Sequence, residues 1–283
     1  MLLPFIIEDY ALGSKVILGI FFVALAIMFF YYGFKMFEMA YVMRNKKPLF
    51  VHAYLKLKKL PVGQRAILET QFIFYTKLSA KEQTYFEHRV VSFIKDKNFI
   101  GRSGLEMTDE VKVLISSTAV MLTFGFRDYY IGLIDKIFVY PDAFYSNTNR
   151  DYHKGEFNPK LKALVLSWYD FKQGYNIGDD NLNLGIHEFA HAIHFNSIKE
   201  KDVSSTLFRD SFNELTTLLS NNKSLRKELI ESKYFRAYAF TNQFEFLAVL
   251  IEYFMETPLD FKNQFPSIYD KVKQMLNFNF AGY

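Results

Sequence analysis

The chain of 283 residues contains no cysteine. Disulfide bonds, thiolate zinc sites and cysteine nucleophiles are therefore excluded, so any metal ion must be bound by histidine, carboxylate and water. Tryptophan occurs once, whereas phenylalanine (32) and tyrosine (19) are abundant, and these large aromatic side chains can fill a core. Half of the residues are hydrophobic, and the length suggests one or two domains.

Charge is absent from residues 16–34 (VILGIFFVALAIMFFYYGF), which lie between Lys15 and Lys35. As a helix these nineteen residues span about 28 Å, close to the hydrocarbon thickness of a bilayer. Tyr31 and Tyr32 fall at its end, where tyrosine favours the membrane interface. A cleaved signal peptide is the competing interpretation, but the apolar run is longer than a typical h-region and no A-x-A-like site follows. We predict a retained transmembrane helix; a buried globular helix is the third alternative.

Positive charge is concentrated directly after this segment. Residues 35–65 carry a net charge of +7, whereas residues 1–34 carry −1 and residues 66–283 carry −2. The positive-inside tendency predicts a single-pass protein of the cell membrane with its large C-terminal part in the cytoplasm. The excess charge also fits attraction to anionic lipid headgroups. It argues against a nucleic-acid-binding face on the soluble part, so no nucleic-acid partner is expected.

The pattern after the basic stretch is that of a globular domain with several helices. Ser79–Glu82 (SAKE) matches a capping box and predicts a helix to about Lys97. Thr108 predicts the start of another helix, which should end near Leu122. A last amphipathic helix is expected over residues 268–275.

Two strands are expected before the most informative motif. Residues 134–140 (IDKIFVY) and 162–168 (KALVLSW) are β-branched and aromatic, and residues 146–151 between them are typical of a loop. If one of these strands were an edge strand, an extended peptide could add to it by backbone hydrogen bonds. A plain core strand is an equally good interpretation of each.

Residues 185–194 (GIHEFAHAIH) contain a His-Glu-x-x-His pattern in an otherwise apolar, helix-prone run. On a helix, positions i and i+4 share a face, so His187 and His191 can bind one ion. Glu188 is then within reach of a water on that ion, which is the arrangement of zinc peptidases. Asp179–Asn181 are expected to cap this helix. The alternative is an ordinary buried helix.

A catalytic zinc site needs a third protein ligand. His194 lies seven residues from His187, about 10.5 Å along the axis, too far for zinc bonds of about 2 Å, and is expected either to contact a metal ligand from behind or to have a packing role. Residues 244–254 (FEFLAVLIEYF) predict a helix that is apolar on nearly all sides and therefore buried. A carboxylate there is costly unless it is paired or bound to metal, which makes Glu245 the candidate for the third ligand.

Two further side chains share the expected face of this helix. Glu252, seven residues after Glu245, could orient a ligating histidine or satisfy buried backbone or arginine groups. Tyr238, seven residues before Glu245, shares the face if the helix begins that early. Its phenol could then donate a hydrogen bond to the oxyanion of a tetrahedral intermediate, and a packed tyrosine is the alternative.

The combined pattern resembles the Mlc titration factor A (MtfA) family of zinc-dependent peptidases, whose active site is similar to that of the catalytic domain of anthrax lethal factor. The resemblance extends over roughly residues 60–280. The matching segments, in chain order, are 132–141 (GLIDKIFVYP), 165–170 (VLSWYD), 183–191 (NLGIHEFAH) and 238–252. By this resemblance His187, His191 and Glu245 are the zinc ligands, Glu188 is the general base and Tyr238 stabilises the oxyanion.

The resemblance also implies an α+β, gluzincin-like fold and aminopeptidase-like activity. One member of the family binds a glucose-responsive transcriptional repressor. The chain departs from the family in two respects: the prototype lacks a transmembrane helix, and members often have aspartate where this chain has His194. Repressor binding is therefore not carried over. For an upstream histidine contact of the prototype, His153 is the nearby candidate.

The predicted protein is a membrane-anchored, zinc-dependent peptidase with a mostly helical domain and a small sheet. Its expected regions are a short N-terminal segment at 1–15, the transmembrane helix at 16–34, a basic juxtamembrane linker at 35–59 and the peptidase domain at 60–283. Its expected partners are Zn²⁺, a peptide or protein substrate, the membrane and a protein regulator. The alternative is a regulatory binding protein that sequesters a transcription regulator or other partner with a non-catalytic zinc. A structural membrane protein without metal is the third candidate.

Overall fold

The computed structural model describes residues 12–146, 150–176 and 178–283, and the chain divides into two units at Leu49 and Phe50. In the first unit the described residues form one long helix, α1 (Leu12–Asn45). An 18-residue window of α1 has a mean hydropathy of 2.4 and is not buried, so α1 could cross a membrane by its length and composition. The helix includes the predicted span 16–34 and continues through residues 35–45.

The second unit contains a four-stranded sheet with the order β1-β2-β6-β5 and a two-stranded ribbon of β3 and β4. The strands β1, β2 and β6 are parallel, and β5 is antiparallel to β6. Their bounds are β1 (Asn98–Gly101), β2 (Lys136–Tyr140), β3 (Phe144–Ser146), β4 (Asp151–His153), β5 (Gly155–Asn158) and β6 (Ala163–Ser167).

The two predicted strands are confirmed as β2 and β6, but both lie inside the sheet. The hypothesis that one of them offers an edge to a peptide was therefore wrong. In the described part of the chain the terminal strand next to β6 is β5, which the sequence did not predict. The loop expected at 146–151 is bounded by the paired ends of β3 and β4, and residues 147–149 lie outside the described residues.

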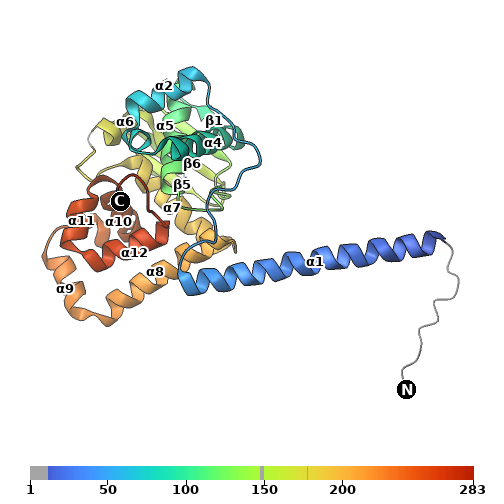
Figure 1. Ribbon diagram of the computed structural model, residues 1–283. Coiled ribbons are helices and arrows are strands. Elements are labelled where there is room, and N and C mark those ends of the chain that lie inside the picture. Colours follow the sequence, from blue (N-terminus) through green and yellow to red (C-terminus); the bar gives the residue numbers. More distant parts are fainter. Residues whose placement is uncertain (1–11, 147–149, 177) are drawn as a thin grey trace. The chain divides into compact units, whose positions relative to one another are not determined.

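Helices surround this sheet, so the fold is α+β and mostly helical, as predicted (Figure 1). The capping box of Ser79 and Glu82 and the cap of Thr108 are confirmed. The helices are α2 (Val62–Gln71), α3 (Ile73–Thr76), α4 (Ala80–Asp96), α5 (Asp109–Leu122), α6 (Trp168–Asn176), α7 (Leu184–Lys199), α8 (Val203–Asn221), α9 (Lys223–Glu231), the 3₁₀ helix η1 (Ala237–Phe240), α10 (Gln243–Glu256), α11 (Pro258–Gln264) and α12 (Pro266–Leu276).

Helix α7 carries the His-Glu-x-x-His motif through the centre of the second unit. It packs against α10, α8 and α5, and β5 lies against it from the sheet (Figure 1). Phe189, Ala190, Ala192 and Ile193 are buried in the core. Because apolar contacts hold α7 on several sides, the polar side chains of its motif have a fixed place.

Candidate metal centre

Asn183 is the N-cap of α7, and its Oδ1 accepts a hydrogen bond of 3.0 Å from the backbone N–H of Ile186. The prediction that Asp179–Asn181 cap this helix was wrong. Asn181 has a φ of 57°, which is left-handed backbone, whereas an N-cap residue has extended φ and ψ. The Nδ2 of Asn183 donates to Gly174 O and to Glu256 Oε1, so the start of α7 is fixed by several hydrogen bonds.

Helix α10 begins at Gln243, where the side chain of Asn242 accepts hydrogen bonds from the backbone N–H groups of Phe244 and Glu245. This cap places Glu245 in the first turn. It also separates Tyr238 from α10, so the condition under which Tyr238 would share the face of Glu245, a helix that begins before Tyr238, is not met. Tyr238 instead lies on η1, and its ring centroid is 6.0 Å from that of His187.

The structure brings His187, His191 and Glu245 together, with three possible ligand atoms within 4.8 Å of one another. The Nε2 atoms of the two histidines are 3.1 Å apart, and Glu245 Oε2 is 3.0 Å from the first and 3.5 Å from the second. In the described part of the chain this is the one group of its kind. Two helices far apart in the sequence thus supply a His₂Glu set.

The chemistry of these three atoms fits a cation. Glu252 Oε1 lies 2.5 Å from His187 Nδ1. Because a carboxylate accepts hydrogen bonds, it favours a proton on Nδ1, and in the neutral imidazole this leaves a lone pair on His187 Nε2. That lone pair faces His191 Nε2 and the carboxylate of Glu245. Converging acceptors repel one another unless a positive charge lies between them, so the residues present fit a metal ion.

The charges of the cluster lead to the same conclusion. Burial alone would lower the pKa of His187, but the carboxylates of Glu245 and Glu252 outweigh it and raise that pKa to about 9. Burial would raise the pKa of Glu245, yet the hydrogen bonds from His187 and His191 hold it well below its usual range. The cluster therefore stabilises positive charge at its centre, which is either a proton on His187 that is donated to Glu245 or a metal ion that takes its place.

Glu252 is 1% exposed, and both roles considered for it from the sequence are observed. It orients His187 and also accepts from the backbone N–H of Asn183 at 3.1 Å. The guanidinium of Arg236 contacts both of its carboxylate oxygens, at 3.0 and 2.7 Å. The sequence analysis missed Arg236. The available signal was the buried Glu252 itself, because such a carboxylate needs a cation and Arg236 lies two residues before Tyr238.

Glu188 follows His187 on α7 and is 7% exposed. Burial raises the pKa of its carboxyl. The first residue of β5, Gly155, lies directly against it: a Cβ atom added there would be 2.7 Å from both Cγ and Oε1 of Glu188 and from Leu184 Cδ1. The backbone of β5 therefore approaches the Glu188 carboxyl as closely as glycine allows.

Tyr238 lies at the open side of the cluster and is 51% exposed. Burial and the neighbouring Glu245 carboxylate raise the pKa of its phenol to about 12. The hydroxyl is therefore protonated at neutral pH and can donate a hydrogen bond.

The other two candidate histidines lie outside the ligand group. His194 is buried among aromatic rings, with the centroids of Phe212 and Phe244 at 4.7 and 5.3 Å, which agrees with the expected packing role. His153 lies on β4, and its Nε2 is buried without a hydrogen-bond partner in the described part of the chain.

Comparison with known proteins shows which family this chain is similar to in sequence. A family described as glucose-regulated metallo-peptidase M90 matches residues 43–277, which include every residue of the site and begin after the apolar segment 16–34. An uncharacterized protein of Synechocystis sp. is 26% identical over 239 residues, which cover 77% of this chain and 84% of the relative. The similarity therefore extends over the second unit rather than over an isolated motif.

Proposed function

The chain belongs to the glucose-regulated metallo-peptidase M90 family, and on this premise we propose that it is a membrane-anchored zinc peptidase whose metal is held by His187, His191 and Glu245. One observation carries the proposal. Three acceptor atoms from α7 and α10 converge, and the buried carboxyl of Glu188 lies beside them. Two imidazoles and one carboxylate with a free fourth position are typical of catalytic zinc sites.

A bound zinc ion would supply two effects, a lower pKa for a water molecule and polarisation of the substrate carbonyl. The chain supplies the proton transfers. Glu188 accepts the proton of the attacking water and delivers it to the leaving amine, and its raised pKa suits both steps because proton transfer is most efficient near the working pH. Tyr238, protonated at neutral pH, donates a hydrogen bond to the oxyanion of the substrate.

The substrate of this reaction is a peptide or protein segment that lies extended along β5. This strand is the terminal one next to β6 in the described sheet, and its first residue contacts Glu188. A peptide that adds to such a strand by backbone hydrogen bonds would place a carbonyl beside the same carboxyl. The resemblance to the MtfA family favours an aminopeptidase-like activity, in which residues are removed from the N-terminus of the peptide substrate.

Metal analysis and peptide profiling of the purified full-length protein test this proposal. We expect about one zinc per chain and cleavage of peptides that a zinc chelator abolishes. Cleavage sites in a mixed peptide library separate release of N-terminal residues from internal cuts. A protein that binds zinc and captures a transcription regulator, but cleaves no peptide, would instead be the regulatory binding protein considered from the sequence.

Replacing Gly155 by alanine should lower peptide hydrolysis by about tenfold or more without removing the metal. The added Cβ would lie 2.7 Å from the Glu188 side chain, so Glu188 must move away from its reactive position. Hydrolysis rates and bound zinc are measured together. Gly63→Ala is the matched control, because no atom lies within 4 Å of a Cβ there. Wild-type activity in Gly155→Ala would show that β5 does not constrain Glu188.

The proposed orientation places the peptidase unit in the cytoplasm. Because the chain has no cysteine, single cysteines can report it without a background signal. In intact cells we expect a membrane-impermeant maleimide to label Ser14→Cys and to leave Ser103→Cys unlabelled until the cells are lysed. The reverse pattern would place the peptidase unit outside the cell.

A further inference from the structure

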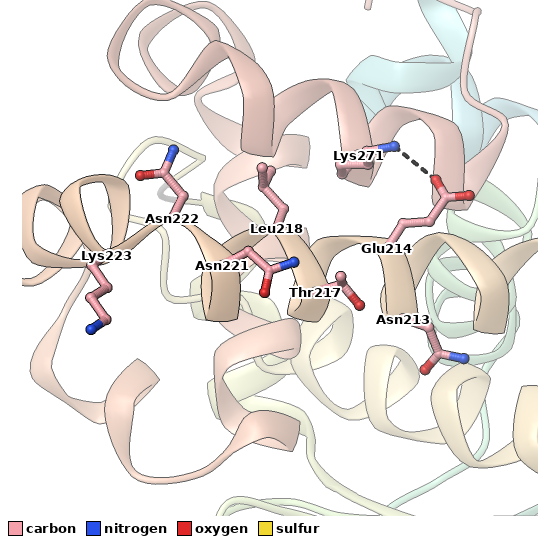
Figure 2. A pocket seen from close by; sticks show the side chains of 8 residues that line it. All are labelled: Asn213, Glu214, Thr217, Leu218, Asn221, Asn222, Lys223 and Lys271. Atoms are coloured by element: carbon pink, nitrogen blue, oxygen red, sulfur yellow. Dashed lines mark hydrogen bonds and ion pairs between the residues drawn. The ribbon is translucent and has the colours of Figure 1, made fainter.

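Among the hollows that the described residues of the second unit form, two are considered because neither is lined by the three candidate metal ligands. The first, of 690 Å³, follows α8 and the start of α9, and its lining, mostly polar apart from Leu218, is shown in Figure 2. Two of its charged side chains pair with each other, since Lys271 Nζ lies 2.7 Å from Glu214 Oε2, and Lys223 lies apart from this pair (Figure 2). Nothing in that hollow calls for a ligand.

The second hollow, of 450 Å³, lies where α3, α6, α10, α11 and α12 meet the start of α7, and we name it the α10 pocket. Its volume falls within the range of small-molecule sites. Apolar side chains form part of its wall, among them Phe72, Met121 and Ile186. Ile186 precedes His187, so the α10 pocket borders the metal-binding helix.

Glu256, in the last turn of α10, gives this pocket an unsatisfied acceptor. Its Oε1 accepts a hydrogen bond from Asn183 Nδ2, but its Oε2 is buried and has no hydrogen-bond partner in the described part of the chain. Burial raises the pKa of this carboxyl to about 7. Buried acceptors are almost always paired, so a hydrogen bond from a bound ligand would remove the free-energy cost of leaving Glu256 Oε2 buried and unpaired.

Positive charge lines the same pocket. Lys77, Lys262 and Lys273 all contribute to its wall, and the ammonium of Lys262 lies 5.8 Å from the ring centroid of Tyr269. The Nζ of Lys273 already donates a hydrogen bond of 2.9 Å to Tyr283 O, so Lys77 and Lys262 are the lysines offered to a ligand. The ammonium groups of Lys77 and Lys262 would repel a ligand that carries only a positive charge. A ligand with a carboxylate for the lysines, a hydrogen-bond donor for Glu256 and an apolar group between them satisfies the whole lining.

We infer that the α10 pocket binds a free apolar α-amino acid. The ammonium group meets Glu256 Oε2, the carboxylate meets the lysines, and the side chain packs against the apolar wall around Phe72 and Met121. This set of contacts uses Glu256 and the ammonium groups of Lys77 and Lys262 and fills the apolar part of the pocket.

Asn183 connects this pocket to the metal centre. Its Nδ2 donates to Glu256, and its backbone N–H donates at 3.1 Å to Glu252, the carboxylate that orients His187. A ligand that moves the Glu256 carboxylate would therefore move Asn183 and, through Glu252, change the hydrogen bond that orients the proposed metal ligand His187. This second step rests on the proposed function. Free amino acids are products of peptide hydrolysis, so a product bound in the α10 pocket would change the affinity of the site for its metal.

Binding is tested by calorimetric titration of the full chain with L-leucine and two analogues. 4-Methylpentanoate lacks the ammonium of leucine, and 3-methylbutan-1-amine lacks its carboxylate. We expect each analogue to bind about tenfold more weakly than leucine or worse, since each loses a charge-assisted hydrogen bond. The absence of leucine binding, or equal binding of 4-methylpentanoate, would overturn the inference.

Two variants locate the site. Glu256→Gln should weaken leucine binding by about tenfold or more, whereas the exposed control Glu231→Gln should not change it. Lys262→Met should remove the preference for leucine over 3-methylbutan-1-amine, which keeps the inference testable if Glu256→Gln does not fold. Unchanged leucine binding in either folded variant at the α10 pocket would contradict the assignment.

Coupling is measured without any reaction, as the zinc affinity in competition with a fluorescent chelator, with and without saturating leucine. We expect leucine to change the zinc affinity of the wild type by severalfold. Asn183→Ser keeps an oxygen to cap α7 but has no Nδ2, so it should abolish this change. A protein that binds leucine through Glu256 but cleaves no peptide would refute the proposed function alone; one that cleaves peptides but binds no leucine would refute this inference alone.

Discussion

Replacing Glu188 by glutamine should lower peptide hydrolysis by about 10²- to 10⁴-fold while zinc stays bound. Glutamine has nearly the same volume, so it fits the narrow space beside Gly155 without a new clash. Its amide cannot accept the proton of the attacking water, so the proton transfer is lost. His187, His191 and Glu245 are unchanged, and the metal-binding set should keep its affinity.

The measurement combines initial rates on the best library peptide with zinc content by mass spectrometry. Glu231→Gln, an exposed position at the end of α9, is the matched control for the loss of one negative charge. Full activity in Glu188→Gln would refute the role of general base. Loss of both zinc and activity would show instead that Glu188 supports the metal site, and the assignment of roles would change.

The burial and the raised pKa of Glu188 also favour a peptidase over a binding protein with a structural zinc. Structural zinc sites are closed by four protein ligands and need no additional carboxyl group. Here the ligand group among the described residues has three members, and an additional carboxyl group, that of Glu188, is buried next to it with a raised pKa. Burial of this group costs folding free energy, which a catalytic role explains and a structural role does not.

Much of the candidate site follows from local sequence rules. The spacing of His187 and His191 is a property of any helix, and the apolar run around Glu245 predicts that a carboxylate there needs a partner. Both arguments use only periodicity and burial. They were sufficient to name the three residues that the structure brings together.

The errors arise where tertiary contacts outweigh local pattern. The segment before α10 is helix-prone, but the side chain of Asn242 caps α10, so the helix begins only after Tyr238. Strand β5 (GEFN) has little strand propensity and exists because it pairs with β6. The buried Glu252 indicates that a cation is needed, but only the fold, which places η1 beside α10, identifies that cation as Arg236. These features depend on chain segments that meet only after folding.

Replacing Glu245 by alanine should lower zinc affinity by at least about a hundredfold, because loss of a partner that merely orients a ligand already costs 10- to 100-fold. The substitution also removes the carboxylate that lies 3.0 Å from His187 Nε2 and 3.5 Å from His191 Nε2. Two neutral imidazoles then remain, and they neutralise none of the charge of a divalent ion. Competition with a chelator of known affinity measures the change.

Glu228→Ala, on the surface helix α9, is the matched control and should keep the wild-type zinc affinity. Glu245→Gln separates charge from shape, since its amide oxygen can still face the two histidines; we expect an affinity between those of the alanine variant and the wild type. Zinc content that is unchanged in Glu245→Ala would assign the third ligand to another carboxylate. Together with retained zinc in Glu188→Gln, a loss in Glu245→Ala would divide the two neighbouring glutamates into one that binds the metal and one that moves the proton.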